Sequence, residues 1–193
     1  MKKNLAVIAA VIVMATFLVG CGKKESPTET EKKEAIKSLS DFAETQQKLG
    51  EAYDKGDPAA AAKMMDSYAQ FGAQLEAQEF EKSEAVDAPS DFPSSLIYGK
   101  GKITQSSDNS DADYINKSIT IKTTEDVKAV KEFYKTLLSQ APWKITSQSS
   151  ETDGASYDAK DASDREANVD ISANTYSKIV EIQISYSGNA VKQ

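Results

Sequence analysis

The sequence contains no histidine and a single cysteine, and these two scarcities narrow the chemistry open to the chain. Without imidazole there is no Ser-His-Asp triad, no zinc ion bound by histidine and no histidine general base. The thiol of Cys21 has no partner for a disulfide within the chain. No Gly-rich phosphate loop stands out, and Ser38 has no base beside it to make it a nucleophile. The residue content therefore favours a protein that is not an enzyme.

Long apolar runs are also scarce. The longest extends from Leu5 to Val19 and is interrupted only by Thr16. A helix that spans a bilayer needs about 20 apolar residues, so this run is short for a permanent anchor. Lys2 and Lys3 precede it, which gives the positive start, short apolar core and small-residue end of a cleaved signal peptide.

The run ends in Leu18-Val19-Gly20-Cys21, which resembles the lipobox of bacterial lipoprotein signal peptides. The resemblance implies that residues 1–20 are removed, that diacylglycerol is attached to the thiol of Cys21, and that the new amino group is acylated. Two or more acyl chains hold a protein stably on a membrane, whereas one holds it weakly. The alternative is that Cys21 is an ordinary thiol beside a short membrane helix.

The residue after the cysteine bears on location. In the lipoproteins of Gram-negative cells that this segment resembles, an aspartate directly after the cysteine resembles a signal that retains the protein in the inner membrane. Gly22 stands at that position. The resemblance therefore implies an outer-membrane lipoprotein facing the periplasm or, in a cell with one membrane, a protein on its outer face.

Basic residues are fewer than acidic ones. The chain has 23 Lys and Arg against 30 Asp and Glu, and removing Lys2 and Lys3 with the leader would lower the basic count to 21. An acidic surface repels phosphate groups, so nucleic acid and direct contact with anionic lipid are poor candidates as partners.

The N-terminal half of the mature chain predicts a tether and a helical hairpin. Residues 21–31 are polar and contain Pro27, which is typical of a flexible tether. Residues 32–84 predict two antiparallel helices, because Gly56 ends the first and Asp57-Pro58 starts the second. Two apolar stripes at helical spacing support this hairpin: Ala35, Leu39, Phe42, Gln46, Leu49 and Tyr53, then Met64, Tyr68, Phe71, Leu75 and Gln78. The hairpin is either a spacer whose stripes bury each other or a coiled coil that binds a partner.

Residues 85–193 predict an α+β domain, and the prolines in Ala88–Pro93 mark its start. Val127, Val130, Phe133, Tyr134, Leu137 and Leu138 form the stripe of one helix, for which Thr123 is the expected cap. The expected order is β-β-α-β-β-β-β in a mostly antiparallel sheet, wet on one side. The six expected strands are Leu96–Thr104, Asp113–Thr123, a strand starting at Trp143, Ala155–Ala159, Ala167–Ala173 and Lys178–Ser187.

Trp143 follows directly after the predicted helix, and we expect it to fill the core between helix and sheet rather than to serve as a platform for a ligand. The order of elements and the proline-bounded start resemble the small α+β domains of many uncharacterised envelope lipoproteins. This likeness implies no defined activity, because a fold does not fix a function.

Two acidic clusters are the remaining candidates for chemistry. They are Asp108, Asp111 and Asp113, then Asp158, Asp161, Asp164 and Glu166. Neither has the spacing and glycine of a calcium-binding EF-hand loop, so we interpret both as solvated turns. No cofactor or metal site is expected.

The leading hypothesis is a membrane-anchored, non-enzymatic envelope lipoprotein that binds a protein or another envelope component. One alternative is a carboxylate-based metal-binding protein or hydrolase. Another is a structural spacer or assembly factor.

Overall fold

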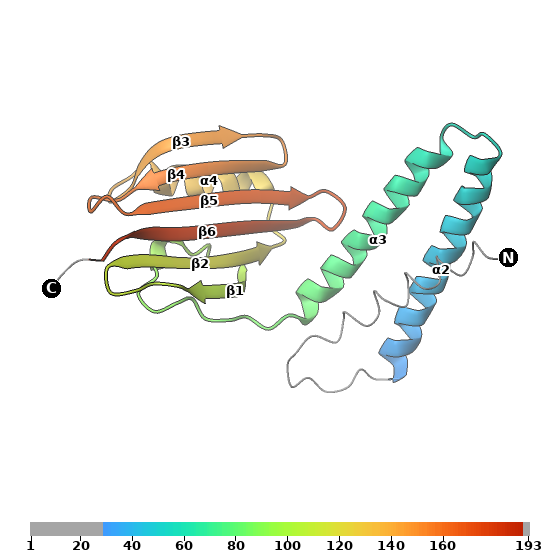
Figure 1. Cartoon of the computed structure of the whole chain (residues 1–193), viewed down its shortest axis with the longest axis horizontal. Coiled ribbons are helices and arrows are strands. Elements are labelled where there is room, and N and C mark those ends of the chain that lie inside the picture. Colours follow the sequence, from blue (N-terminus) through green and yellow to red (C-terminus); the bar gives the residue numbers. More distant parts are fainter. Residues whose placement is uncertain (1–28, 191–193) are drawn as a thin grey trace. The chain divides into compact units, whose positions relative to one another are not determined.

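The computed structural model describes residues 29–190, and its contacts divide the chain into two compact units. The division falls between Gly72 and Ala73, inside the second long helix. The sequence places a boundary near Ala85 instead, so the contacts assign the end of this helix to the second unit. Helix α2 and most of α3 make up the described part of the first unit, and the sheet belongs to the second (Figure 1).

The first unit contains the predicted helical hairpin. Helix α2 spans Glu29–Asp54 and α3 spans Ala60–Lys82. Gly56 has a φ of 83°, a left-handed conformation that glycine adopts without steric cost, and it ends α2. Asp57 then accepts a hydrogen bond at Oδ1 from the backbone N–H of Ala59, at 2.9 Å, which orders the turn before α3; the helix itself begins at Ala60, two residues after the predicted first position, Pro58.

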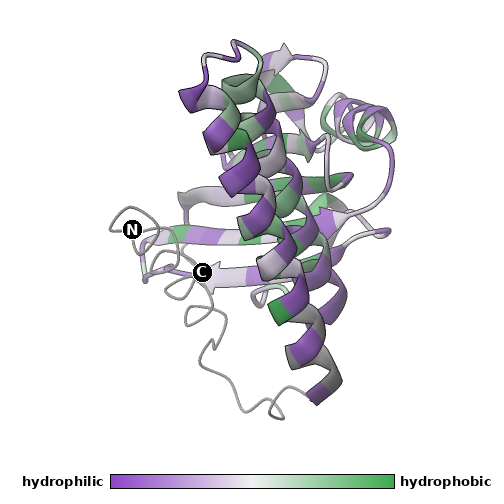
Figure 2. Ribbon diagram, turned by 90° about the vertical axis from the view of Figure 1, so that its right-hand side faces the viewer, coloured by the Kyte–Doolittle hydropathy of each residue, from purple (hydrophilic) through white to green (hydrophobic). Residues whose placement is uncertain are grey.

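The two helices of the hairpin are joined by a small set of side chains. The ring of Phe42 stacks on Phe71 with 4.2 Å between centroids and meets the ring of Tyr68 edge-on at 5.2 Å. Beside them, Gln46 Nε2 donates to Ser67 Oγ at 3.1 Å. Gln46 is 6% exposed, and its Oε1 has no hydrogen-bond partner among the described residues. Hydrophilic residues cover much of both helices (Figure 2), so the contact between them is shallow.

The second unit contains one sheet of six strands in which every neighbouring pair is antiparallel, and the sheet order is β1-β2-β6-β5-β4-β3. Helix α4, Val127–Leu138, connects β2 to β3. The predicted α+β class and the order β-β-α-β-β-β-β are confirmed. The strands are β1 Lys102–Asp108, β2 Tyr114–Thr123, β3 Lys144–Ser150, β4 Gly154–Lys160, β5 Glu166–Asn174 and β6 Ile179–Asn189.

Two local predictions were wrong. Leu96 to Thr104 is not a strand: Ser94–Leu96 is a short 3-10 helix, and β1 begins only at Lys102. Leu96 is fully buried in this irregular segment, so its apolar side chain reflects tertiary contacts and not a strand. Thr123 does not cap α4 either, because Asp126 accepts from the backbone N–H of Lys128 at 2.7 Å. Thr123 ends β2 and donates its hydroxyl to the carbonyl of Lys100.

Helix α4 lies behind the sheet in Figure 1 and covers one of its faces. Val130, Tyr134 and Leu138, spaced four residues apart, are fully buried against the sheet. Tyr134 also donates its hydroxyl to the carbonyl of Leu96 at 2.9 Å, and burial raises its pKa. Trp143 is 6% exposed and meets Tyr186 edge-on, which confirms its expected place in the core.

The last turns of α3 are held to the sheet by polar contacts within the second unit. Lys122 Nζ lies 3.3 Å from a carboxylate oxygen of Glu76 and 3.3 Å from one of Glu181. Burial acts to lower the pKa of Lys122, but the two carboxylates outweigh it and raise that pKa. Lys102 Nζ donates to the carbonyls of Phe80 and Ser83 near the C-terminus of α3, where a cation is favourable.

Candidate ligand-contact face of the sheet

Cys21, the predicted lipid attachment site, lies outside the residues that the structure describes, as do the predicted signal peptide and most of the predicted tether. Within residues 29–190 no helix combines the length and the apolar content needed to cross a bilayer.

The first acidic cluster is engaged in the turn between β1 and β2. Asp108 forms an ion pair with the buried ammonium group of Lys117 at 3.1 Å and accepts from the backbone N–H of Ser110. Hydrogen bonds from Ser110 and the charge of Lys117 lower the pKa of Asp108. Asp111 Oδ1 accepts from the backbone N–H groups of Asp113 and Tyr114. These carboxylates therefore order a turn.

The second acidic cluster surrounds the turn between β4 and β5. Asp161 accepts from the backbone N–H groups of Ser163 and Arg165 and pairs with the guanidinium of Arg165 at 2.9 Å. Burial acts to raise the pKa of Asp161, but these hydrogen bonds outweigh it and lower that pKa. Lys160 pairs with both Asp164 and Glu166. Among the described residues, no group of three or more carboxylates or thiols is placed to hold a metal ion.

The face of the sheet turned away from α4 is polar across all six strands. We call it the open face. Strand register aligns its side chains in rows that run across the sheet, and the central rows contain no apolar side chain. These rows are Ser149, Ser156, Asp170, Gln183, Thr120 and Gln105; then Ser147, Asp158, Asn168, Ser185, Ser118 and Ser107; then Gly154, Ser172, Glu181, Lys122 and Lys102.

The middle row is linked internally by hydrogen bonds. Asn168 donates to Asp158 at 2.7 Å and accepts from the hydroxyl of Ser185 at 3.1 Å. Ser118 and Ser107 share a hydrogen bond at 3.0 Å. Because these groups satisfy one another, they fix their rotamers and make the centre of the open face ordered.

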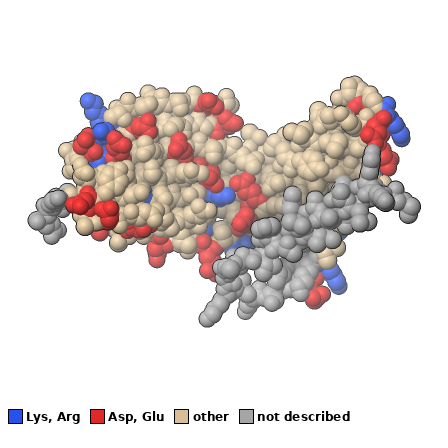
Figure 3. Space-filling view, viewed as in Figure 1, with Lys and Arg blue, Asp and Glu red and all other residues tan. Residues whose placement is uncertain are grey.

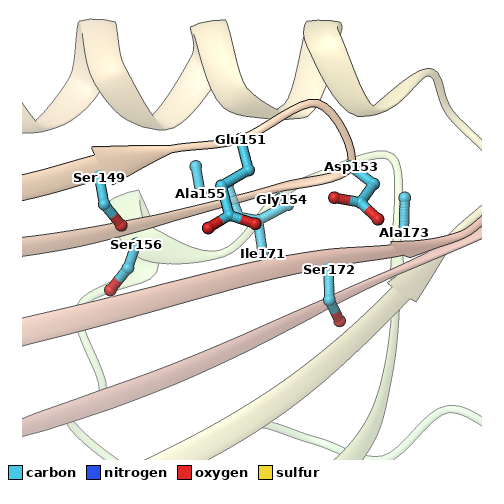
Figure 4. Close-up of a pocket in the computed structure, with 9 residues that line it drawn as sticks. All are labelled: Ser149, Glu151, Asp153, Gly154, Ala155, Ser156, Ile171, Ser172 and Ala173. Atoms are coloured by element: carbon cyan, nitrogen blue, oxygen red, sulfur yellow. The ribbon is translucent and has the colours of Figure 1, made fainter.

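A pocket of about 270 Å³ lies at one corner of this face, beside the turn between β3 and β4. The hydroxyls of Ser149, Ser156 and Ser172 point to the side of the sheet away from α4, and the carboxylates of Glu151 and Asp153 lie over the same region (Figure 4). Gly154 lets β4 and β5 approach closely beside the pocket, because a Cβ there would lie 2.7 Å from the carbonyl oxygen of Ile171 and would require the backbone to shift.

Three carboxylates at this corner differ from the other acidic groups of residues 144–190. The carboxylates of Glu151, Asp153 and Asp170 take part in no side-chain hydrogen bond or ion pair among the described residues, although the backbone carbonyl of Glu151 accepts from Lys131 Nζ. Asp170 lies opposite Ser156, a lining residue of the pocket. We call Glu151, Asp153 and Asp170 the acidic corner. Figure 3 shows carboxylate atoms spread over this side of the sheet.

The sequence predicted part of this face. The alternation of polar and apolar residues in β6 indicated a sheet wet on one side, which is what the structure contains. The acidic corner was missed, because Glu151 and Asp170 come together only through the pairing of β3, β4 and β5. The one signal in the sequence was Gly154 directly after two acids in a short turn.

A family model described as START domain-like matches residues 103–179, less than half of the chain. The matched region runs from β1 to the first residue of β6, and it includes α4 and the pocket. No curated protein and no solved structure matches the chain. The structure thus defines an α+β protein whose sheet-containing unit is similar to START-like domains.

Proposed function

We propose that the protein is a lipoprotein of the cell envelope, held on a membrane through Cys21, that binds a protein or another envelope component without catalysing a reaction. The observation that carries the anchor is the short apolar run that ends in Leu18-Val19-Gly20-Cys21. If the cell is Gram-negative, Gly22 after the cysteine favours the outer membrane and the periplasm.

The binding role has support from the second unit. It pairs a tightly packed core on one face of the sheet with an ordered, exposed polar face on the other. Such a rigid support suits a contact surface, because little conformational entropy is lost when a partner docks. The START domain-like match also favours a role in binding.

The acidic clusters support a non-enzymatic role. Asp108, Asp161, Asp164 and Glu166 are already engaged by lysine, arginine or backbone N–H groups. A general acid or base needs to reach a substrate inside a site that excludes water. These carboxylates lie at turns and spend their hydrogen-bonding capacity on holding those turns.

The anchor is tested by labelling cells with a radioactive fatty acid and separating membranes from soluble protein. The wild-type chain should carry label and sediment with membranes, whereas Cys21→Ser should lose the label and remain uncleaved. Ser38→Ala is the matched control, since it alters one small side chain on the predicted hairpin and should change neither result. Equal labelling and equal processing of Cys21→Ser would remove the proposal.

The binding role is tested by cross-linking in intact cells with photoreactive amino acids placed on the second unit. Reproducible adducts with one protein or glycan are expected. Adducts with lipid alone would contradict this half of the proposal and leave a spacer as the better account.

A further inference from the structure

The open face is exposed or half-buried in its central rows, Glu76 of α3 contacts Lys122 in the third row, and the charge of the face is unbalanced at one end. At the end near Lys160, the Lys160 ammonium group is matched by Asp164 and Glu166. At the end near the β3–β4 turn, the three carboxylates of the acidic corner face one nearby cation, Lys131 of α4, which donates its ammonium group to the backbone carbonyl of Glu151 and pairs with none of the three carboxylates. The third row contains two cations, and both are engaged: Lys122 is shared by Glu76 and Glu181, and Lys102 donates to the carbonyls of Phe80 and Ser83. Negative charge therefore accumulates where the pocket lies.

The size of the pocket restricts what enters it. About 270 Å³ is below the range of about 300–1,000 Å³ that is usual for small-molecule and cofactor sites. It is sufficient for the end of one side chain. Three hydroxyls and two carboxylates line it, so an ammonium or guanidinium group would find both charge and hydrogen-bond acceptors there.

The spacing of the open face matches an extended chain. Side chains of one face repeat about every 6.5–7 Å along a strand, and neighbouring strands lie about 4.8 Å apart. From the pocket, Asp170 on β5 and then Asp158 on β4 continue the series of carboxylates across the face. Asp170 and Asp158 are diagonal neighbours on adjacent strands, about 7–8 Å apart, so an extended peptide with basic residues at alternate positions places its charges at a similar interval.

We propose that the acidic corner and the adjoining open face bind a basic, extended segment of a partner protein, with one lysine or arginine side chain seated in the pocket between Glu151 and Asp153. This inference rests on the proposed function and adds the surface and the chemistry of the partner. Charge complementarity supports it: the unpaired carboxylates attract cations, and the polar rows accept hydrogen bonds from a peptide backbone.

The test uses the intact lipidated protein in nanodiscs of phosphatidylcholine, a neutral lipid that does not itself attract a basic peptide. The probe is a fluorescent eight-residue peptide of alternating lysine and serine. The variant is Glu151→Gln, Asp153→Asn and Asp170→Asn combined. The matched control is Glu79→Gln, Asp87→Asn and Glu132→Gln combined, which removes the same charge from exposed positions outside the sheet.

The wild-type protein and the control should bind the peptide with affinities within about twofold, and the corner variant should bind about tenfold more weakly. Binding should weaken as salt rises, because exposed charges are screened beyond about 10 Å at 0.1 M. The inference is overturned if the wild type does not bind, if the control loses as much as the corner variant, or if a lysine-acetylated peptide binds equally well. Binding of a glucosamine tetramer in place of the peptide would also overturn it, in favour of a glycan.

Cross-linking in cells separates this inference from the proposed function. A photoreactive residue at Ser172 lies on the open face, whereas one at Lys135 lies on α4. Adducts with a protein at Ser172 support the inference. Adducts at Lys135 and none at Ser172 overturn it while the binding function stands, and adducts at neither position overturn both.

Discussion

Helices α2 and α4 show how differently the two units use an apolar stripe. Helix α4 has 12 residues, and its Val130, Tyr134 and Leu138 have no exposed surface. Helix α2 has 26 residues, and Gln46 is the only buried one among its described side chains. The helix that meets a sheet buries its stripe fully, because the sheet presents apolar side chains from several strands at once. A helix that meets one other helix buries only a narrow seam.

The difference implies unequal stability. In the hairpin Tyr53, Met65 and Tyr68 remain more than half exposed, so little apolar area leaves water when it forms. In the second unit the core extends through the sheet, α4 and the segment before β1. We therefore expect the hairpin to open locally at a lower free energy than the sheet.

The largest expected effect separates these regions directly. Tyr134→Ala removes a fully buried ring and its hydrogen bond to the carbonyl of Leu96, and it should lower the free energy of unfolding by about 3–5 kcal/mol. Met65→Ala on α3, where Met65 is 73% exposed, should change it by less than about 0.5 kcal/mol. Chemical denaturation followed by the fluorescence of Trp143 measures the first change in the second unit, and the helical circular dichroism signal, to which α2 and α3 contribute most, measures the second. Equal losses would show that the two regions are not distinct in packing.

A smaller effect is expected at the turn between β4 and β5. The pKa of Asp161 is lower in the folded protein than in the unfolded chain. Its negative charge therefore stabilises the fold at pH values above the pKa of the unfolded chain, and this contribution is lost as the pH falls below about 4. Asp161→Asn should cost about 1–2 kcal/mol at neutral pH, because it weakens the contacts with Arg165. Unfolding measured from pH 7 to pH 2 should show a shallower loss for the variant. Parallel curves for the two proteins would contradict this assignment.

The smallest effect is expected in the hairpin and has the opposite sign. Gln46 buries an oxygen without a partner among the described residues, so Gln46→Leu should stabilise the hairpin by about 1 kcal/mol. Hydrogen exchange of the amides of α2 and α3 measures this locally. Slower exchange confined to these helices is expected; faster exchange would mean that the bond from Gln46 to Ser67 is worth more than the buried oxygen costs.

Periodic patterns predicted the elements whose burial follows from local sequence. The stripe of α4 and the alternation in β6 each identify a face within a dozen residues, and both agree with the structure. The segment before β1 was misassigned for a physical reason: Leu96 and Tyr98 are buried by tertiary contacts in an irregular backbone, so their apolar character carries no period.

The candidate site could be predicted less well than the fold. The polar residues of the strands indicate a wet face, but the rows that cross it depend on the register between strands far apart in sequence. Asp158 and Asp161 look alike in the sequence, yet one joins the hydrogen-bonded centre of the open face and the other holds Arg165 at a turn. Only the pairing of strands far apart in the sequence distinguishes these two residues from Asp170, whose carboxylate has no hydrogen-bond or ion-pair partner among the described residues.

The most direct measurement is mass spectrometry of the N-terminal peptide of the protein extracted from its native membrane. The account predicts a peptide that begins at Cys21 and carries the added mass of diacylglycerol, with or without a further acyl chain on its amino group. An N-terminus that still contains the apolar segment from Leu5 to Val19, or an unmodified Cys21 thiol, would contradict it.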